Sequence, residues 1–561
     1  MNSSYKSVFT TISVLIGGAL LLSANEPSGW WPRQEAPTAY VTTALPKGLE
    51  EQVILQALTG LKARAVNEGK GDELVWIDQR QTQSQEWRDR TIKRLTLDGR
   101  GEVTVETLLE QAVKSGIVKG YVLYSADISE GLAYKPREGI DNSLNTATMA
   151  AARLSGIPVT IKSESQMRAL GLSCLFDAKG QEPLTYFKSH QKDFQGGGSV
   201  GLLDPKTANN RDLMIAHTLP VTYGDHPGVE AILEGVVPPA SVIGWGMGNE
   251  FKHCLMVSRF GHFHTVSNWI LNATFYSAGS LDYQPKRIAA LDESKIDWSD
   301  KRRCMAFMMS DGDNTAYAQA GITTPRYWGN AAHGEFPMGF SVCAGDLASF
   351  SPVTLDWMSE TKPPATSLIQ FTGGYFYPDR FAESRSNRWE LLRQHARRIN
   401  VQMERSGVRI MTAIFDKSEG AEAKQALKIF AEEMPSLLGI FVMDYAPYNR
   451  SKGRLDWIDD GRGGKVPALA ARYCLWQKMK SPLAGEPQTL PAIINADEES
   501  LIGGWAAVHA WSSYETPDGK KLHGMDAVKA TVDGLDANKV HIVSPEELLL
   551  RMRNEKPERL K

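Results

Sequence analysis

The second half of the chain alternates short apolar runs with longer amphipathic stretches. Between the runs, the stretches 386–406 and 421–433 show helical spacing of their apolar residues most clearly. This alternation is typical of α/β layers built on a parallel sheet. Six or seven βα units within about 260 residues match the size of a closed (β/α) barrel, with an open doubly wound sheet as the alternative. The strands predicted from the apolar runs are 304–309, 338–343, 368–371, 410–415, 438–443, 490–494 and 540–543.

The first half shows the same alternation in shorter units. Apolar residues from Leu49 to Leu61 recur at helical spacing, and Gly156 follows a predicted helix as a candidate left-handed cap. The glycine-punctuated segment 244–250, which carries a tryptophan and a carboxylate, is predicted to be a loop. The fold class is therefore multidomain α/β. The predicted parts are an N-terminal α/β (Rossmann-like) domain at 35–135, a second α/β domain at 136–225, a third small domain or connector at 226–295, and a C-terminal (β/α) barrel-like catalytic domain at 296–561.

The N-terminus has the pattern of a secretory signal peptide. Lys6 precedes an apolar run at 8–22, and small and polar residues follow it. We expect residues 1–24 to be removed by cleavage after Ala24, which makes the protein exported, periplasmic or extracellular. An uncleaved anchor is the alternative. No second apolar run of similar length follows, so we expect no stable membrane insertion after processing.

Charge and cysteine content narrow the function classes. The chain has 561 residues and a formal net charge of -3, which gives no support for nucleic-acid binding. Its 5 cysteines are scattered without the short spacings of a zinc site, so we expect buried apolar residues. The odd number leaves at least one thiol free.

Acidic residues follow the predicted strands of the C-terminal half. If these strands are parallel, their carboxyl ends share one rim, where the active sites of barrels lie. A single Asp after a strand is more often a helix cap, but several on one rim favour a cleft with clustered carboxylates. Such clusters suit glycosidic bond hydrolysis, in which one carboxyl donates a proton and another attacks or activates water. The candidate catalytic residues are Asp311, Asp313, Asp416 and Asp444, followed by Asp346.

Aromatic residues cluster on the same rim. The segment TGGYFYPDR at 372–380 follows a predicted strand, and its glycines allow a sharp turn. Tyr375 and Tyr377 alternate on an extended segment, so they point the same way and are able to stack on a sugar or hydrogen-bond a carboxylate. A packed corner that supports the barrel is the alternative. The predicted substrate contacts are Asn314, Gly374, Tyr375, Tyr377, Tyr445 and Trp511.

Other chemistries have weaker sequence support. The segment 311–315 begins like an EF-hand loop, but Thr315 and the missing downstream glycine break the pattern. His262 and His264 alternate before the predicted barrel, while His333 and His509 stand alone. No GxSxG elbow occurs. We therefore expect no metal and no cofactor, with a divalent cation near Asp311 and Asp313 as the alternative.

Two motifs resemble those of a known family. The run FMMSDGDN at 307–314, followed by GGYFYP at 373–378, is similar to the GxGYxYP proteins, which are exported bacterial proteins regarded as glycoside hydrolases. Thr372 stands where the motif has its first glycine. The resemblance extends over nearly the whole mature chain, through 56–61 and 119–124 in the N-terminal half and 444–448 and 541–547 in the C-terminal half. It implies a site near these motifs and assigns no catalytic residue.

The sequence thus predicts a glycoside hydrolase that cleaves an oligo- or polysaccharide with paired carboxylates. One alternative is a metal-dependent polysaccharide deacetylase, which chelation would inactivate. The other is a non-catalytic glycan-binding protein, whose affinity would survive replacement of Asp311 and Asp444. No oligomeric state follows from the sequence.

Overall fold

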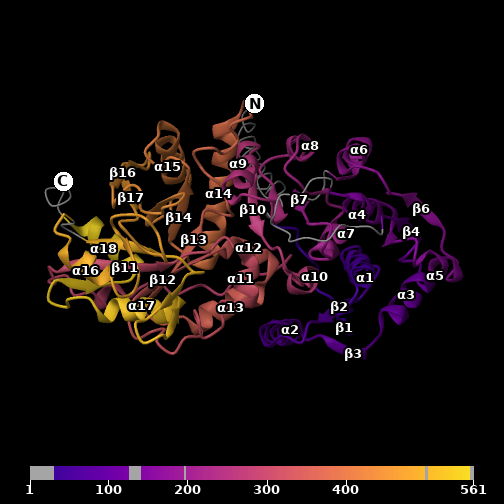
Figure 1. Ribbon diagram of the computed structural model, residues 1–561, viewed down its shortest axis with the longest axis horizontal. Coiled ribbons are helices and arrows are strands. Elements are labelled where there is room, and N and C mark those ends of the chain that lie inside the picture. Colours follow the sequence, from indigo (N-terminus) through magenta and orange to yellow (C-terminus); the bar gives the residue numbers. More distant parts are fainter. Residues whose placement is uncertain (1–30, 126–139, 195–197, 500–502, 556–561) are drawn as a thin grey trace, which may run out of the picture.

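The computed structural model describes residues 31–125, 140–194, 198–499 and 503–555. The predicted signal peptide 1–24 lies outside these residues. The described chain is a multidomain α/β protein in which three small parallel sheets precede one large curled sheet. In Figure 1 the curled sheet with its helices forms one side of the molecule and the small sheets form the other, with β10 (Phe263–Val266) and α9 (Glu250–Arg259) between them.

The first small sheet has the strand order β2-β1-β3, and both pairings are parallel. The helix after β1 is buried along most of its length because it also packs against α7 of a later unit. The elements are β1 (Ala39–Ala44), α1 (Leu49–Asn67), β2 (Glu73–Asp78), α2 (Thr82–Leu95), β3 (Asp98–Glu102) and α3 (Val105–Lys114).

The second small sheet has the order β5-β4-β6, and the third has the order β10-β9-β7-β8, again all parallel. The elements of the second are β4 (Gly120–Leu123), α4 (Ser143–Leu154), β5 (Gly156–Val159), α5 (Glu164–Ala169), β6 (Cys174–Asp177), α6 (Pro183–Ser189) and the 3₁₀ turn η1 (Gln191–Phe194). Those of the third are β7 (Ser199–Leu202), α7 (Arg211–His217), β8 (Val221–Thr222), α8 (Pro227–Gly235), β9 (Ser241–Gly244), α9, β10 and α10 (Ala273–Tyr276), and the 3₁₀ turn η2 (Glu293–Lys295) follows.

The large sheet has the order β16-β17-β15-β14-β13-β12-β11-β20-β18-β19, and β23 also pairs with β11. Only β16 is antiparallel to its neighbour. Its first part contains β11 (Arg303–Met309), α11 (Thr315–Ala320), β12 (Met338–Val342), α12 (Ala344–Phe350), α13 (Pro352–Thr361), β13 (Thr366–Phe371), α14 (Arg388–Ser406), β14 (Ile410–Phe415), α15 (Ala421–Glu433) and β15 (Gly439–Asp444).

The remaining elements complete the sheet and its flank. They are β16 (Leu455–Asp459), β17 (Lys465–Ala470), β18 (Tyr473–Leu475), β19 (Ala484–Gly485), α16 (Leu490–Ala496), β20 (Gly503–Val508), α17 (Gly524–Asp533), β23 (Val540–Ile542) and α18 (Pro545–Asn554), with a separate hairpin of β21 (Ser513–Glu515) and β22 (Lys521–His523).

The curl of the sheet follows from the run 465–475. Its first half pairs with β15, and its second half pairs with β20. Between the halves, the N–H of Ala471 donates to Val442 of β15 and that of Arg472 donates to Trp505 of β20. One stretch of chain therefore brings the two flanks of the sheet together, and the carboxyl ends of the parallel strands gather at one end of the curl.

Alternate residues of the central strand face opposite sides, as a pleated strand requires. Met305, Phe307 and Met309 of β11 belong to the apolar layer under the helices. Ala306 and Met308 belong to a second cluster inside the curl. In that cluster the rings of Phe441 and Trp505 pack edge to face, with centroids 5.1 Å apart. Side chains thus fill the curl except near its carboxyl end.

Most predicted strands are confirmed, and three local predictions are wrong. The run 490–494 is helix α16, because Pro491 fits a first helical turn and Leu490 and Ile494 bury one face. The left-handed cap after α4 is Ser155, one residue before Gly156. Glu250 is the first residue of α9, so the loop there is 245–249. Strand β20 was not predicted.

The parallel α/β units are confirmed, but the finer architectures are not. The small sheets have three or four strands, which is short of a Rossmann-like doubly wound sheet. The large sheet is curled and carries an antiparallel edge strand, so a regular (β/α) barrel is not confirmed. The domain boundaries stay predictions. All 5 cysteines are free, and each except Cys174 is buried. Within the described ranges, no helix has both the length and the apolar composition needed to cross a bilayer.

Candidate active site

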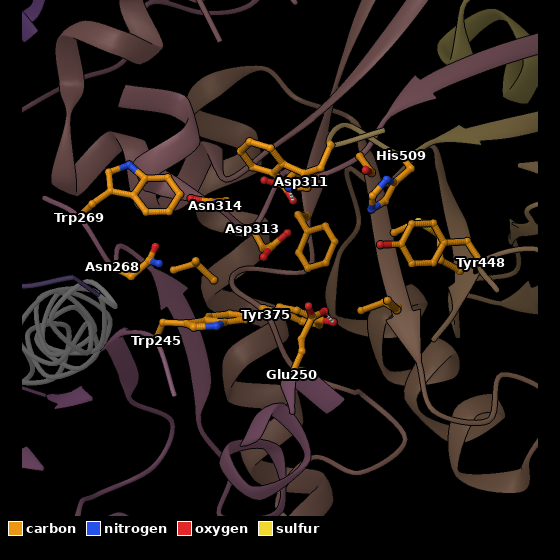
Figure 2. Close-up of a pocket in the computed structure, with 16 residues that line it drawn as sticks. Trp245, Glu250, Asn268, Trp269, Asp311, Asp313, Asn314, Tyr375, Tyr448 and His509 are labelled. Carbon is orange, nitrogen blue, oxygen red and sulfur yellow. Dashed lines mark hydrogen bonds between the residues drawn. The ribbon is translucent and has the colours of Figure 1, made fainter. Parts of the chain in front are cut away.

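A cavity of about 230 Å³ opens at the carboxyl end of the curled sheet. Figure 2 shows acidic side chains and aromatic rings pointing into it from several sides. Both halves of the chain contribute. Residues 245–269 supply Trp245, Glu250, Val266, Asn268 and Trp269, and the C-terminal half supplies Ser310, Asp311, Asp313, Asn314, Phe371, Ile414, Met443, Tyr375, Tyr448, His509 and Trp511.

Asp311 follows β11 in a left-handed backbone conformation, with φ of 75°. Such a φ is uncommon for a residue with a side chain and marks a position under constraint. The indole Nε1–H of Trp511 donates a 2.8 Å hydrogen bond to Oδ1 of Asp311. Oδ2 is buried and has no hydrogen-bond partner in the described part of the chain. One oxygen of this carboxyl is therefore held in place by Trp511.

Asp313 and Asn314 lie one turn further on. Asp313 is 9% exposed, and Asn314 accepts a 2.9 Å hydrogen bond from the N–H of Tyr317, so it caps α11. The hydroxyl of Thr315 donates to the carbonyl of Val266 on β10 at 2.6 Å. The loop that carries both acids is thus bound to the third small sheet.

Glu250 is the third acid of the cavity, and it comes from the N-terminal half. It begins α9, and its Oε1 accepts a 2.6 Å hydrogen bond from the phenol of Tyr375. Tyr375 lies on the loop after β13, so this bond links two elements that are 125 residues apart.

The electrostatics of the cavity favour protonated acids. Burial raises the pKa of Asp311 to about 7, and the charge of Glu250 contributes. Burial also raises the pKa of Asp313 well above its usual range, with the charges of Asp311 and Glu250 adding to the effect. The pKa of Glu250 is raised by burial and lowered by the bond from Tyr375. The lining residues include no lysine or arginine to offset these charges.

Aromatic and imidazole groups complete the walls. Trp269 and Trp511 are 44% and 46% exposed, so their faces reach solvent at the cavity. His509 stacks on Trp476 with centroids 4.2 Å apart, and burial lowers its pKa to about 4, which keeps the imidazole neutral. The pKa of the Tyr448 phenol is raised by burial, so it remains a hydrogen-bond donor.

Gly373 and Gly374 allow the loop after β13 to approach β10 closely. Gly374 has φ of 106°, and a Cβ there would lie 2.3 Å from Cδ2 of Phe263. The next residue, Tyr375, exchanges backbone hydrogen bonds of 2.8 and 2.9 Å with His264 of β10. The absence of a side chain at 374 therefore lets the loop pair with β10 and places the Tyr375 phenol on Glu250.

The comparisons with known proteins bear on this half of the chain. Residues 302–553 match the family model described as GxGYxYP putative glycoside hydrolase C-terminal domain. We refer to residues 302–553, which match this family model, as the GxGYxYP domain. The GxGYxYP domain thus contains Asp311, Asp313 and the Tyr375 loop, whereas Glu250 lies outside the matched residues.

A solved structure shares the fold of the GxGYxYP domain and of the N-terminal half of the chain. It is the crystal structure of a putative hydrolase from Bacteroides thetaiotaomicron, with a TM-score of 0.75 and 19% sequence identity. The match covers 94% of this chain and 96% of that one, so the two share one architecture over nearly their whole length. No curated protein matches this chain.

The structure brings some sequence candidates together at the cavity and places others elsewhere. Asp311, Asp313, Asn314, Tyr375 and Trp511 line it. Tyr377 is buried behind Tyr375, where its ring contacts Phe251 and Tyr445, and Gly374 packs against Phe263. These three positions, Gly374, Tyr377 and Tyr445, support the lining without forming part of it.

Three of the acids predicted from the sequence do not line the cavity. Asp416 accepts hydrogen bonds of 2.9 and 2.6 Å from the guanidinium of Arg380. Asp444 accepts a 3.0 Å bond from the N–H of Ser451 and fixes the loop after β15. Asp346 is fully buried on α12, close enough to Asp313 to affect its pKa, although burial of Asp313 is the larger cause.

Several lining residues were not among the sequence candidates. Glu250 and Trp245 belong to the glycine-rich segment after β9, which is itself the carboxyl end of a parallel strand. Applying the strand-end argument to the N-terminal half would have identified them. His509 follows β20, which the sequence did not predict. Asn268 and Trp269 follow β10, and Tyr448 follows β15, so the same argument covers them.

Proposed function

We propose that this protein is a glycoside hydrolase and that Asp311, Asp313 and Glu250 form its catalytic centre. The supporting observation is that three carboxyl groups from two halves of the chain line one cavity whose other walls are largely aromatic. Asp313 is buried, Asp311 is half-buried, and Glu250 is more exposed. The description of the matched family points to the same reaction. In this proposal the curled sheet serves as a barrel-like scaffold, with the site at the carboxyl ends of its strands.

In this mechanism Asp313 is the general acid. It lies next to Asp311 and Glu250, so ionisation of all three is disfavoured, and its pKa is raised well above the usual range by burial and by those two charges. Its carboxyl proton passes to the glycosidic oxygen while the bond from that oxygen to the anomeric carbon breaks. The leaving sugar departs as an alcohol.

Asp311 is the carboxylate partner. The hydrogen bond from Trp511 favours its ionised form, so it releases its proton before Asp313 does. It either attacks the anomeric carbon or takes a proton from the attacking water, and the anomer of the product distinguishes the two. The ionised Glu250, held by Tyr375, stabilises the positive charge that develops on the sugar ring.

The exposed tryptophans of the cavity wall indicate the substrate class. Trp269 and Trp511 are nearly half exposed at the cavity, and aromatic faces of this kind stack on the C–H faces of sugar rings. We therefore propose an oligo- or polysaccharide substrate and an exported enzyme. Mass spectrometry of the secreted protein is expected to show an N-terminus at Asn25.

The test is incubation with a panel of oligo- and polysaccharides, followed by product analysis. The wild type is expected to release reducing sugar from at least one substrate, and Asp311→Asn, Asp313→Asn and Glu250→Gln each to lose a factor on the order of 10²–10⁴ in kcat. Asp444→Asn keeps the acceptor for Ser451 and is expected to retain activity within about threefold. Asp416→Asn is a second comparison outside the lining.

The same panel distinguishes the alternatives. Release of acetate without sugar, abolished by a chelator, would identify a deacetylase. Binding without turnover, unaffected by Asp313→Asn, would identify a glycan-binding protein. Equal losses in the lining variants and in Asp444→Asn would contradict the proposed centre.

A further inference from the structure

Two histidines and a cysteine meet behind the cavity wall. His253 and Cys254 are neighbours on α9, and His264 lies on the adjacent strand β10. One ligand atom from each lies within 4.8 Å of the others. The exposed fractions are 4% for His253 and 0% for Cys254 and His264. We refer to these three residues as the His–Cys–His cluster.

The imidazoles of the cluster lack ordinary partners. Neither ring nitrogen of His253 and neither of His264 makes a hydrogen bond to the described part of the chain. In the buried His262, by contrast, only Nδ1 lacks a partner, because Nε2 lies 2.8 Å from the carbonyl of Leu233. Leaving a buried polar atom without a partner is costly, so four such nitrogens in one place favour a ligand-binding site.

We propose that the His–Cys–His cluster binds one zinc ion. Two imidazole nitrogens and a thiolate are the donors that zinc prefers, whereas calcium and magnesium require oxygen. Tetrahedral zinc holds its ligand atoms about 3.5 Å apart, so atoms that already lie within 4.8 Å of one another need only a small further approach. A water molecule completes the four positions. The proposal does not depend on the proposed function.

The charge balance of the site is favourable. On binding, the thiol of Cys254 loses its proton to solvent, and both imidazoles remain neutral and bind through lone pairs. The ion and the thiolate together carry a net charge of +1. Burial raises the pKa of the Cys254 thiol, and the charge of Glu250 also acts on it. An ionised Glu250 would therefore offset part of the positive charge.

The place of the ion in the fold indicates a positioning role. It would join α9 to β10 directly behind Trp245, whose ring lies 4.4 Å from that of His253 and 5.4 Å from that of His264. The same α9 carries Glu250, and the backbone of His264 pairs with Tyr375. Zinc would therefore fix the two elements whose side chains form the Glu250–Tyr375 hydrogen bond, without touching a substrate.

The first measurement is the metal content of the full-length protein, purified without a histidine tag. We expect about one zinc per chain by mass spectrometry. After removal with a chelator, titration with Co²⁺ is expected to saturate at one ion per chain and to give the near-ultraviolet band of a thiolate–cobalt bond. The wild type alone decides this point, so it does not depend on whether a variant folds.

Variants identify the ligands. Cys254→Ser is expected to abolish the thiolate–cobalt band, whereas Cys304→Ser, which replaces another buried cysteine, keeps it. His264→Gln is expected to weaken cobalt binding at least tenfold, whereas His262→Gln, two residues away, binds as the wild type does. Added zinc is expected to raise the melting temperature of the wild type and not that of Cys254→Ser.

Three outcomes would overturn the proposal. The first is no metal and no cobalt band in the wild type. The second is a cobalt band that persists in Cys254→Ser. The third is stoichiometric copper in place of zinc, which would keep the ligands and refute the assigned ion.

Discussion

The phenol of Tyr375 donates a 2.6 Å hydrogen bond to Oε1 of Glu250. This bond crosses from the GxGYxYP domain to a helix of the N-terminal half, and both residues line the cavity. This bond explains why a tyrosine follows the two glycines of the motif GGYFYP. The glycines allow the close backbone contact with β10, and that contact places the Tyr375 phenol within hydrogen-bond distance of Glu250.

Tyr375→Phe removes this donor. The hydrogen bond from Tyr375 lowers the pKa of Glu250, so that pKa is expected to rise further when the donor is lost. Because the mechanism needs Glu250 ionised, the acid limb of the profile of kcat against pH moves to higher pH. Tyr377→Phe is the matched control, since its hydroxyl lies 3.5 Å from that of Tyr375 and does not touch Glu250. Equal shifts in the two variants would contradict this role.

Trp511→Phe keeps an aromatic face but removes the N–H that donates to Asp311. The pKa of Asp311, raised by burial to about 7, is expected to rise again because its ionised form loses a donor. The acid limb of kcat/KM therefore moves upward in pH, while KM at the optimum changes little. An unchanged profile would show that this hydrogen bond does not control the ionisation.

The two acids of the cavity are expected to make the free energy of unfolding fall as the pH of the solution rises. Burial raises the folded pKa of Asp311 to about 7 and that of Asp313 well above its usual range, from unfolded values near 4. Their contribution to stability is therefore complete below about pH 4 and is lost as the pH rises through the folded pKa of each acid. Asp313→Asn removes one such group. Urea unfolding is expected to give a variant more stable than wild type at pH 8, by on the order of 1–3 kcal/mol, and nearly equal at pH 4. A variant less stable at pH 8 would refute the direction of the shift.

Gly374→Ala tests the close contact of the motif loop. A Cβ at 374 would lie 2.3 Å from Cδ2 of Phe263 and 2.9 Å from the carbonyl of His264, at φ of 106°. We expect a loss of about 2–4 kcal/mol in the free energy of unfolding, together with loss of activity. Gly519→Ala, at φ of 81° with nothing within 4 Å, carries only the backbone cost of about 1 kcal/mol. Similar losses in both would exclude the steric explanation.

Much of the curled sheet could be predicted because its central strands are continuous apolar runs. Residues 410–415 form β14, for example, and all of them are buried. Strand β20 was missed because GGWAAV has only two large apolar residues, and its stability comes from pairing with β11 and β18. The run 490–494 has the composition of a strand, but Pro491 and the 3.6-residue spacing of its buried positions give a helix.

The site could be predicted only where acids follow strands of one sheet. Asp311 and Asp313 reach the cavity in this way, while Asp416 follows a strand just as directly and instead pairs with Arg380. Local sequence does not reveal that partner. The same argument marks Glu250 as a candidate, but it does not show that Glu250 shares a cavity with Asp311, because that depends on the pairing of His264 with Tyr375, a contact between distant segments.

The boundary of the matched family region has a practical consequence. A fragment made from residues 302–553 alone would carry Asp311 and Asp313 but would lack Glu250, Trp245 and Trp269. The hollow would then be open along one side, and the phenol of Tyr375 would have lost its acceptor. Surveys or expression trials that cut the chain at that boundary would therefore sample only part of the centre, and inactivity of such a fragment would say nothing about the intact protein.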